Sequence, residues 1–142
     1  MSMTERKRIL LLCLVILLVL GASLYFALQL RPTRTPETVH IVMTTFQFGF
    51  NVTDIPNFQE GKIYPSPTLT VHKGQNVVIE LTTLDIVHGF AIDEMSVQAY
   101  ILPGQTVTVS FVADRVGNFT YYCNVFCGVG HPYMHGIFQV LP

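Results

Sequence analysis

Hydrophobic and polar residues divide the 142-residue chain into two parts with different periodicity. Residues 9–30 form a continuous apolar run without a charged side chain. A helix needs about 20 apolar residues to cross the hydrocarbon core of a bilayer, so this run predicts a membrane-spanning helix. Three basic residues precede it and Arg31 and Arg34 follow it. This excess before the run predicts that residues 1–8 are cytoplasmic and that the rest of the chain lies outside.

A cleaved signal peptide is the alternative interpretation of this run, because the small residues at 21–23 resemble a cleavage site. The apolar sequence continues to Leu28, however, whereas the apolar core of a signal usually has about 7–15 residues. The length therefore favours a retained anchor. Cys13 lies inside the run and is interpreted as a membrane-facing or helix-packing residue.

The second part, 39–142, follows a Pro-containing linker at 31–38 and consists of short β-like runs. Two runs flank turn residues at 73–75, and another pair flanks Pro and Gly at 103–104. Further runs precede the cysteine at 123 and end the sequence. Short strands at regular spacing with Gly and Pro turns predict an all-β sandwich or barrel.

An aromatic alternation marks one of the expected strands. Phe46, Phe48 and Phe50 occupy every second position and should share one face of that strand. The segment that follows, 51–67, has no periodicity and contains three prolines. We expect an irregular surface segment there.

The charge of the second part limits its partners. After Pro36 there are eight acidic side chains and three basic ones, so this part carries about −5 although the whole chain carries −1. This balance disfavours nucleic-acid binding and is compatible with a basic protein partner. Asp85, Asp93 and Glu94 flank a histidine at 88 and are candidates for steering such a partner.

Soft donor atoms are concentrated in one short segment, CNVFCGVGHPYM, and the chain has only one further cysteine. Its glycines and proline disfavour a helix. A disulfide between Cys123 and Cys127 would leave His131 and Met134 without a role. Structural zinc sites prefer Cys and His, and a catalytic thiol needs one cysteine with a base. Thiolate, thioether and imidazole together are the donors that copper selects.

The number of donors bears on the number of metals. A mononuclear blue-copper site uses two histidines, one cysteine and a weak axial methionine. The segment supplies one histidine, and His88, set among apolar residues, is the candidate for the second. The additional cysteine suits two coppers bridged by both sulfurs. One electron shared over two metals in a rigid site would suit an electron relay rather than a hydrolytic enzyme.

The spacing Cys-x3-Cys-x3-His-x2-Met, with His88 placed 35 residues (123 − 88) before Cys123, resembles the binuclear CuA centre of cytochrome c oxidase subunit II. The single N-terminal anchor, DIVHGF and CNVFCGVGHPYM are most similar to subunit II of the B-family haem-copper oxidases. The resemblance implies a cupredoxin-like Greek-key β-sandwich for 39–142, behind one N-terminal transmembrane α-helix. This fold agrees with the strand pattern.

The resemblance also implies a ligand set for two copper ions. Cys123 and Cys127 would bridge both metals. His88 and Met134 would complete one copper. His131 and the backbone carbonyl of Val125 would complete the other. Many relatives have glutamate where this chain has valine at 125, which leaves the family's magnesium contact open here without affecting a carbonyl ligand.

The function implied is that of the electron-entry subunit of a haem-copper terminal oxidase, an oxidoreductase, with no catalytic residue on this chain itself. Its partners would be a soluble cytochrome c or cupredoxin as donor and haem in subunit I, which reduces oxygen. The chain would be single-pass in the cell membrane, with the copper domain on the outer, periplasmic side. Phe46, Phe48 and Phe50 match an aromatic stretch that the family links to electron entry, although alternating phenylalanines are more often core residues.

Three other functions stay open at this point. The partner of the same kind of centre could be a nitric oxide reductase. A membrane-tethered copper carrier would bind Cu(I) reversibly and would lack an electron shared between two metals. A purely structural disulfide domain would use only the two cysteines.

Overall fold

The computed structural model describes residues 2–29, 36–52 and 62–142. The chain forms two compact units, Met1–Thr35 and Pro36–Pro142. Most of the expected linker at 31–38 and the middle of the expected irregular segment at 51–67 lie outside the described residues. The described end of that segment, from residue 62 to 67, has no regular structure, as expected.

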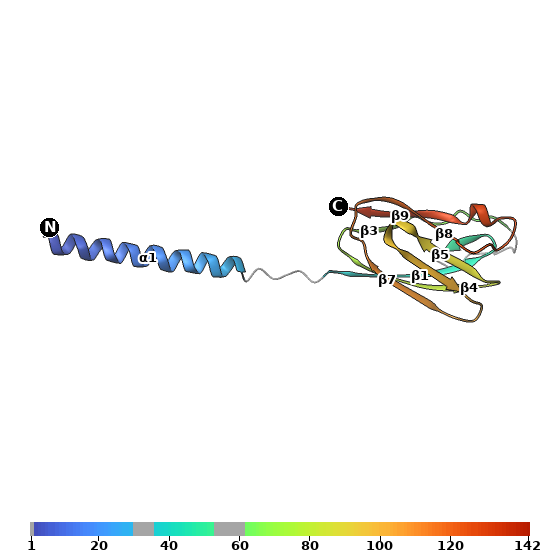
Figure 1. Ribbon diagram of the computed structural model, residues 1–142, viewed down its shortest axis with the longest axis horizontal. Coiled ribbons are helices and arrows are strands. Elements are labelled where there is room, and N and C mark those ends of the chain that lie inside the picture. Colours follow the sequence, from blue (N-terminus) through green and yellow to red (C-terminus); the bar gives the residue numbers. More distant parts are fainter. Residues whose placement is uncertain (1, 30–35, 53–61) are drawn as a thin grey trace. The chain divides into compact units, whose positions relative to one another are not determined.

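Among its described residues the first unit contains one helix, α1 (Met3–Gln29), which is long and apolar enough to cross a membrane (Figure 1). It begins six residues before the apolar run because Ser2 and Glu5 form a capping box. The Ser2 hydroxyl accepts from the Glu5 N–H at 3.3 Å, and the Glu5 carboxylate accepts from the Ser2 N–H at 2.8 Å. The 27 residues correspond to about 40 Å of helix. This helix fits a single-pass membrane protein.

The second unit is a sandwich of two sheets (Figure 1). The four-stranded sheet has the order β2-β1-β4-β7 and the five-stranded sheet the order β3-β9-β8-β5-β6. The bounds are β1 Thr38–Phe46, β2 Gly49–Asn51, β3 Leu69–His72, β4 Asn76–Thr83, β5 His88–Ile92, β6 Val97–Ile101, β7 Val107–Val112, β8 Gly117–Tyr122 and β9 His135–Leu141. Two short 3-10 helices, η1 (Asp93–Met95) and η2 (His131–Tyr133), lie in the connections.

Pairing within the sheets is mixed. β1 pairs in parallel with β4, and β3 pairs in parallel with β9, whereas the other neighbours are antiparallel. The expected strands on both sides of 73–75 and of 103–104 are confirmed. The all-β sandwich predicted from the alternating pattern is therefore the observed fold of this unit.

The core lies between the two sheets and is built from alternate residues of the strands. In β3, for example, Leu69 and Val71 are buried while Thr70 and His72 are exposed. At its centre the rings of Phe90 and Tyr121 are stacked, with centroids 5.7 Å apart. Aromatic packing of this kind contributes to the dense interior between the two sheets.

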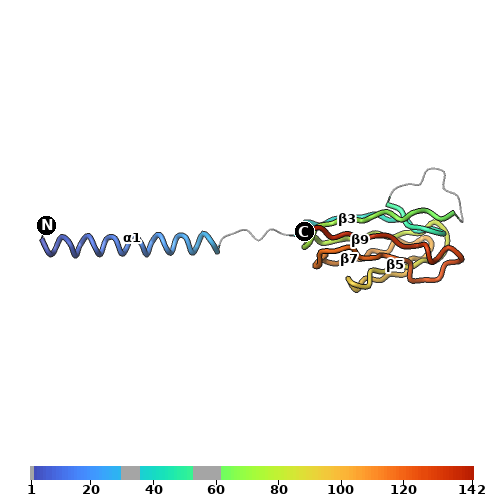
Figure 2. Tube along the Cα trace, turned by 90° about the horizontal axis from the view of Figure 1, so that it is seen from above, coloured from blue at the N-terminus to red at the C-terminus, as the bar shows by residue number. Residues whose placement is uncertain are grey.

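The aromatic segment is not the single strand that its alternation predicted. β1 ends at Phe46, Gln47 and Phe48 form a turn, and β2 returns antiparallel from Gly49. All three phenylalanines are nevertheless buried. In both views this turn lies at the same end of the sandwich as the loop between β8 and β9, and the C-terminus lies at the other end (Figures 1 and 2).

Candidate metal centre

The donor-rich segment forms the loop from Cys123 to Met134, between β8 and β9, and we call it the donor loop. Its two ends are joined, since the Cys123 N–H donates to the Met134 carbonyl at 3.0 Å. The turn of η2 bends its second half, with the His131 N–H donating to the Gly128 carbonyl at 3.1 Å. The loop is therefore a closed, hydrogen-bonded unit rather than a helix, as its glycines and proline predicted.

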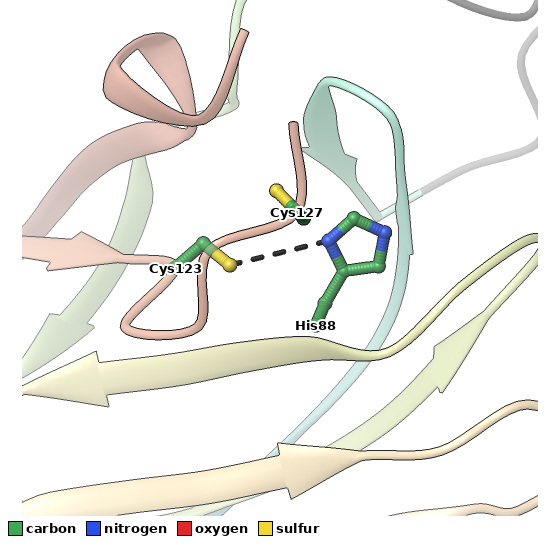
Figure 3. A group of neighbouring side chains, drawn as sticks. All are labelled: His88, Cys123 and Cys127. Carbon is green, nitrogen blue, oxygen red and sulfur yellow. Dashed lines mark hydrogen bonds between the residues drawn. The ribbon is translucent and has the colours of Figure 1, made fainter. Parts of the chain in front are cut away.

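His88 comes from a different part of the chain, at the first residue of β5. One ring nitrogen of His88 and the sulfur atoms of Cys123 and Cys127 all lie within 4.8 Å of one another. Figure 3 shows the imidazole and the two thiols converging, with His88 Nδ1 3.9 Å from Cys123 Sγ. The histidine chosen from sequence alone thus reaches the two cysteines.

The remaining predicted donors surround the same thiols. Cys127 Sγ lies 3.6 Å from His131 Nδ1 and 3.2 Å from the Met134 sulfur. Cys123 Sγ–H donates to the backbone carbonyl of Val125 at 3.1 Å. The structure therefore brings all six predicted donors together, with one histidine beside each cysteine.

Most of these donor side chains are shielded from water. His88 is 0% exposed, both cysteines are 3% exposed and Met134 is 1% exposed. His131 is half-buried, and the ring of Phe126 lies 5.7 Å from it and is 79% exposed. The centre is thus shielded, with one imidazole at its outer edge.

Hydrogen bonds from outside the donor set orient His88 and Cys123. His88 Nε2 donates to Asp85 Oδ1 at 2.8 Å, which leaves Nδ1 facing Cys123. The N–H of Gly89 donates to Cys123 Sγ at 3.3 Å. A Cβ at Gly89 would lie only 1.9 Å from the side-chain oxygen of Asn124, so glycine permits this close approach.

The surroundings of the site raise the pKa values of His88 and Cys127 and lower the pKa of Cys123. Burial alone would lower the pKa of His88, but hydrogen bonds with Cys123 and Asp85 raise it. Burial would likewise raise the pKa of Cys123, but His88 and the Gly89 N–H lower it. Burial and the neighbouring thiol instead raise the pKa of Cys127 to about 12. The contact with His88 and the Gly89 N–H therefore favours the thiolate form of Cys123.

Asp85 has a different place from the one expected. Its place near His88 in the sequence predicts a surface charge that could steer a partner, as for Asp93 and Glu94. Its side chain is only 13% exposed and is turned inward onto His88. Burial would raise the pKa of Asp85, but N–H donors from Gln47 and Ile86 and the contact with His88 lower it. Its position three residues before His88 was the sequence signal for this contact.

The three phenylalanines proposed for electron entry are buried inside the protein, and Phe48 lies against the donor loop. Phe46 and Phe50 are fully buried, and the Phe50 ring packs edge-on against Tyr121 with a centroid distance of 5.3 Å. Phe48 is 6% exposed and faces the donor loop. Their packing role is visible, and their role in electron entry stays a prediction.

The donor set fits copper better than zinc. Two thiols, two imidazoles and a thioether are soft or borderline donors, and a methionine is not among the usual ligands of structural zinc. The cysteines are free in the structure. A cluster of buried soft donors on a β-sandwich is typical of a copper protein of the electron-transfer class.

Comparison with known proteins identifies the family. Residues 48–141 match the model for cytochrome c oxidase subunit II, periplasmic domain, and the chain belongs to this family. It is 29% identical over 105 residues to cytochrome c oxidase subunit 2 of Thermus thermophilus, across 74% of this chain and 67% of that protein. A second, longer sequence with the same name and from the same species is matched over 54% of its length. Nitrous-oxide reductase of Stutzerimonas stutzeri is 38% identical over 77 residues, which is 12% of that protein.

Solved structures support the same fold. A chain of a haem-copper terminal oxidase dimer superposes with a TM-score of 0.61 at 21% identity, over 96% of this chain and 99% of that one. The periplasmic domain of cytochrome oxidase subunit II from Bradyrhizobium japonicum gives a TM-score of 0.59 at 19% identity, over 75% and 87% of the two chains. The predicted cupredoxin-like sandwich is thereby confirmed as the fold of the second unit.

Proposed function

We propose that this chain is the electron-entry subunit of a haem-copper terminal oxidase and that it holds a binuclear CuA centre. One observation carries the proposal. Each of the two free, buried thiols lies beside one donor of each of the two ligand pairs that the family resemblance implies. Cys123 lies beside His88 and the Val125 carbonyl, and Cys127 lies beside His131 and Met134.

This arrangement suits two sulfurs that bridge two metals. His88 and Met134 would hold one copper ion, and they approach different thiols. His131 and the Val125 carbonyl would hold the other copper, and they also approach different thiols. Each metal would therefore share both sulfurs. A mononuclear site would need only one of them.

When bound, the copper pair would supply one-electron redox chemistry. The protein's own residues fix the ligands so that little rearrangement accompanies it. The Cys123 N–H closes the donor loop on Met134, and Asp85 holds the His88 ring in one orientation. Burial of both thiols and of His88 excludes water and competing ligands.

The partners proposed are a soluble cytochrome c or cupredoxin, which would reduce this centre, and haem in subunit I, which would receive the electron for oxygen reduction. The helix α1 would anchor the chain in the cell membrane with the sandwich on the periplasmic side. Phe126 offers an exposed ring beside the half-buried His131. It is a more accessible point of electron entry than the buried Phe46, Phe48 and Phe50.

The test is EPR spectroscopy with copper counting on the full chain in detergent after copper loading. We expect two coppers per chain and a hyperfine pattern from one electron shared over both. Cys127→Ser should abolish that pattern. Rapid reduction of the centre by a reduced cytochrome c would then establish the relay. A single-copper pattern with reversible Cu(I) binding would instead indicate a copper carrier, and failure to bind copper would indicate a structural domain.

A further inference from the structure

The turn between β1 and β2, Gln47 and Phe48, covers the donor loop from a distant part of the sequence. The side-chain amide nitrogen of Gln47 donates a hydrogen bond to the backbone carbonyl of Cys127, across 80 residues of sequence. Gln47 is half-buried and Phe48 is buried. The turn is therefore packed against the loop rather than projecting into solvent.

Gln47 also forms a second hydrogen bond, through its backbone, to the carboxylate that contacts His88. Its backbone N–H donates to Asp85 Oδ2 at 2.6 Å. The other oxygen of the same carboxylate accepts from His88 Nε2 at 2.8 Å. One residue is thus hydrogen-bonded to Cys127 through its side chain and, by way of Asp85, to His88 through its backbone.

Phe48 shows how closely the turn fits. A Cβ at Gly128 would lie 3.0 Å from the Gln47 amide nitrogen and 3.1 Å from the Phe48 ring. A Cβ at Gly130 would lie 2.2 Å from the same ring. The glycines of the donor loop therefore provide the surface on which the turn rests.

The hydrogen bonds of Gln47 connect Cys127 and His88, which lie in segments far apart in the sequence. Backbone hydrogen bonds from Gly128 to Met134 brace the second half of the donor loop. The Cys127 carbonyl lies just before this half and is held by the Gln47 amide. His88 belongs to β5 and is held by Asp85. Gln47 is the residue through which these two restraints meet.

We propose that Gln47 is a positioning residue that fixes Cys127 and His88 relative to each other before copper binds. The inference rests on the copper centre proposed above. Hydrogen-bonding partners outside a metal's ligand set typically change metal affinity by about 10- to 100-fold. The amide donor is the essential feature, since a side chain of equal size without an N–H cannot hold the Cys127 carbonyl.

The experiment compares variants of the full chain in detergent. Gln47→Met keeps the side-chain volume and removes the donor, Gln47→Lys restores an N–H donor, and Gln105→Met is the control at an exposed turn. Copper-loaded samples are challenged with a copper chelator, and retention is followed by EPR. We expect Gln47→Met to retain copper about 10- to 100-fold less well, with Gln47→Lys and Gln105→Met close to wild type.

A second measurement needs no copper. Hydrogen–deuterium exchange of the peptide spanning the donor loop, in the reduced copper-free chain, should be faster in Gln47→Met than in wild type and Gln47→Lys. If Gln47→Met does not fold, Gln47→Asn, whose amide is one methylene shorter, should show the same faster exchange and weaker retention.

The outcomes separate the two proposals. Wild-type chain without a two-copper signal would overturn the proposed function. A normal wild-type signal with unchanged retention and exchange in Gln47→Met, or in Gln47→Asn where the Met variant does not fold, would overturn only the role of Gln47. Equal losses in Gln47→Met and Gln47→Lys would also overturn it, because the shape of the side chain rather than its donor would then be what matters.

Discussion

Adding one methyl group at Gly130 should force the β1–β2 turn away from the donor loop. The new Cβ would lie 2.2 Å from Cγ and Cδ2 of Phe48 and 2.8 Å from its Cβ. Carbon atoms in contact are normally separated by about 3.5–4.0 Å. Rotation of the ring cannot relieve the overlap, because the Phe48 Cβ is also too close. Since Gly130 has φ −89° and ψ 0°, alanine is tolerated by the backbone, and the cost is steric.

Overpacking of this kind typically costs about 1–3 kcal/mol. Phe48 is 6% exposed, so moving it outward would also expose apolar surface. For a domain of about 100 residues, each kcal/mol lowers the melting temperature by roughly 4–8 °C. We therefore expect Gly130→Ala to melt at least about 4 °C below wild type, measured by circular dichroism on the reduced, copper-free chain.

Introducing Gly130→Ala into a chain that already carries Phe48→Ala tests whether the Phe48 ring causes the loss of stability. There the Gly130→Ala methyl group has no ring to displace, so it should cost little or should stabilise by filling space. The coupling between the two substitutions should be at least about 1 kcal/mol, within the range seen for residues in contact. Equal costs of Gly130→Ala in both backgrounds would refute the clash with Phe48.

Three further changes probe other parts of the domain. Tyr121→Phe removes the hydroxyl that donates to the Pro67 carbonyl at 2.6 Å and should cost about 0.5–1.5 kcal/mol in thermal unfolding, because a partly buried acceptor loses its hydrogen-bond donor; an unchanged midpoint would contradict this. The hydrogen bond to Asp93 raises the pKa of Tyr122, so Asp93→Asn should move that phenol's ionisation to lower pH in an ultraviolet titration, and an unmoved curve would show that the bond does not persist in solution. Met134→Leu should retain two coppers and shift the reduction potential, because axial thioether ligation is weak; loss of the metal would contradict its proposed place.

Much of the metal centre could be predicted because its donors are close in sequence. Four side-chain donors fall within Cys123–Met134, and glycine and proline in that segment exclude a helix. His88 could be predicted as a ligand because a histidine among apolar residues tends to be buried and then needs a polar or metal partner. The capping signature of Ser2 and Glu5 could also have indicated the start of α1.

The contacts of Gln47 could not be predicted in this way. Its bond to Cys127 depends on the packing of one sheet against the other, and no local pattern reports a contact across 80 residues. The alternation of Phe46, Phe48 and Phe50 was misleading for a physical reason. A strand and a tight hairpin can both bury every second aromatic residue, and only the pairing of β1 with β2 distinguishes them.

The parallel pairing of β3 with β9 has a consequence for the order in which the domain can form. Leu69 pairs with Phe138 and His72 with Leu141, so the five-stranded sheet needs the strand that follows the donor loop. During synthesis α1 emerges long before that strand, and pairing between such distant segments is slow compared with local structure. The sheet that carries His88 can therefore be completed only after the donor loop and β9 have both been synthesised. Full enclosure of the proposed copper site thus depends on a strand that is synthesised after the donor loop itself.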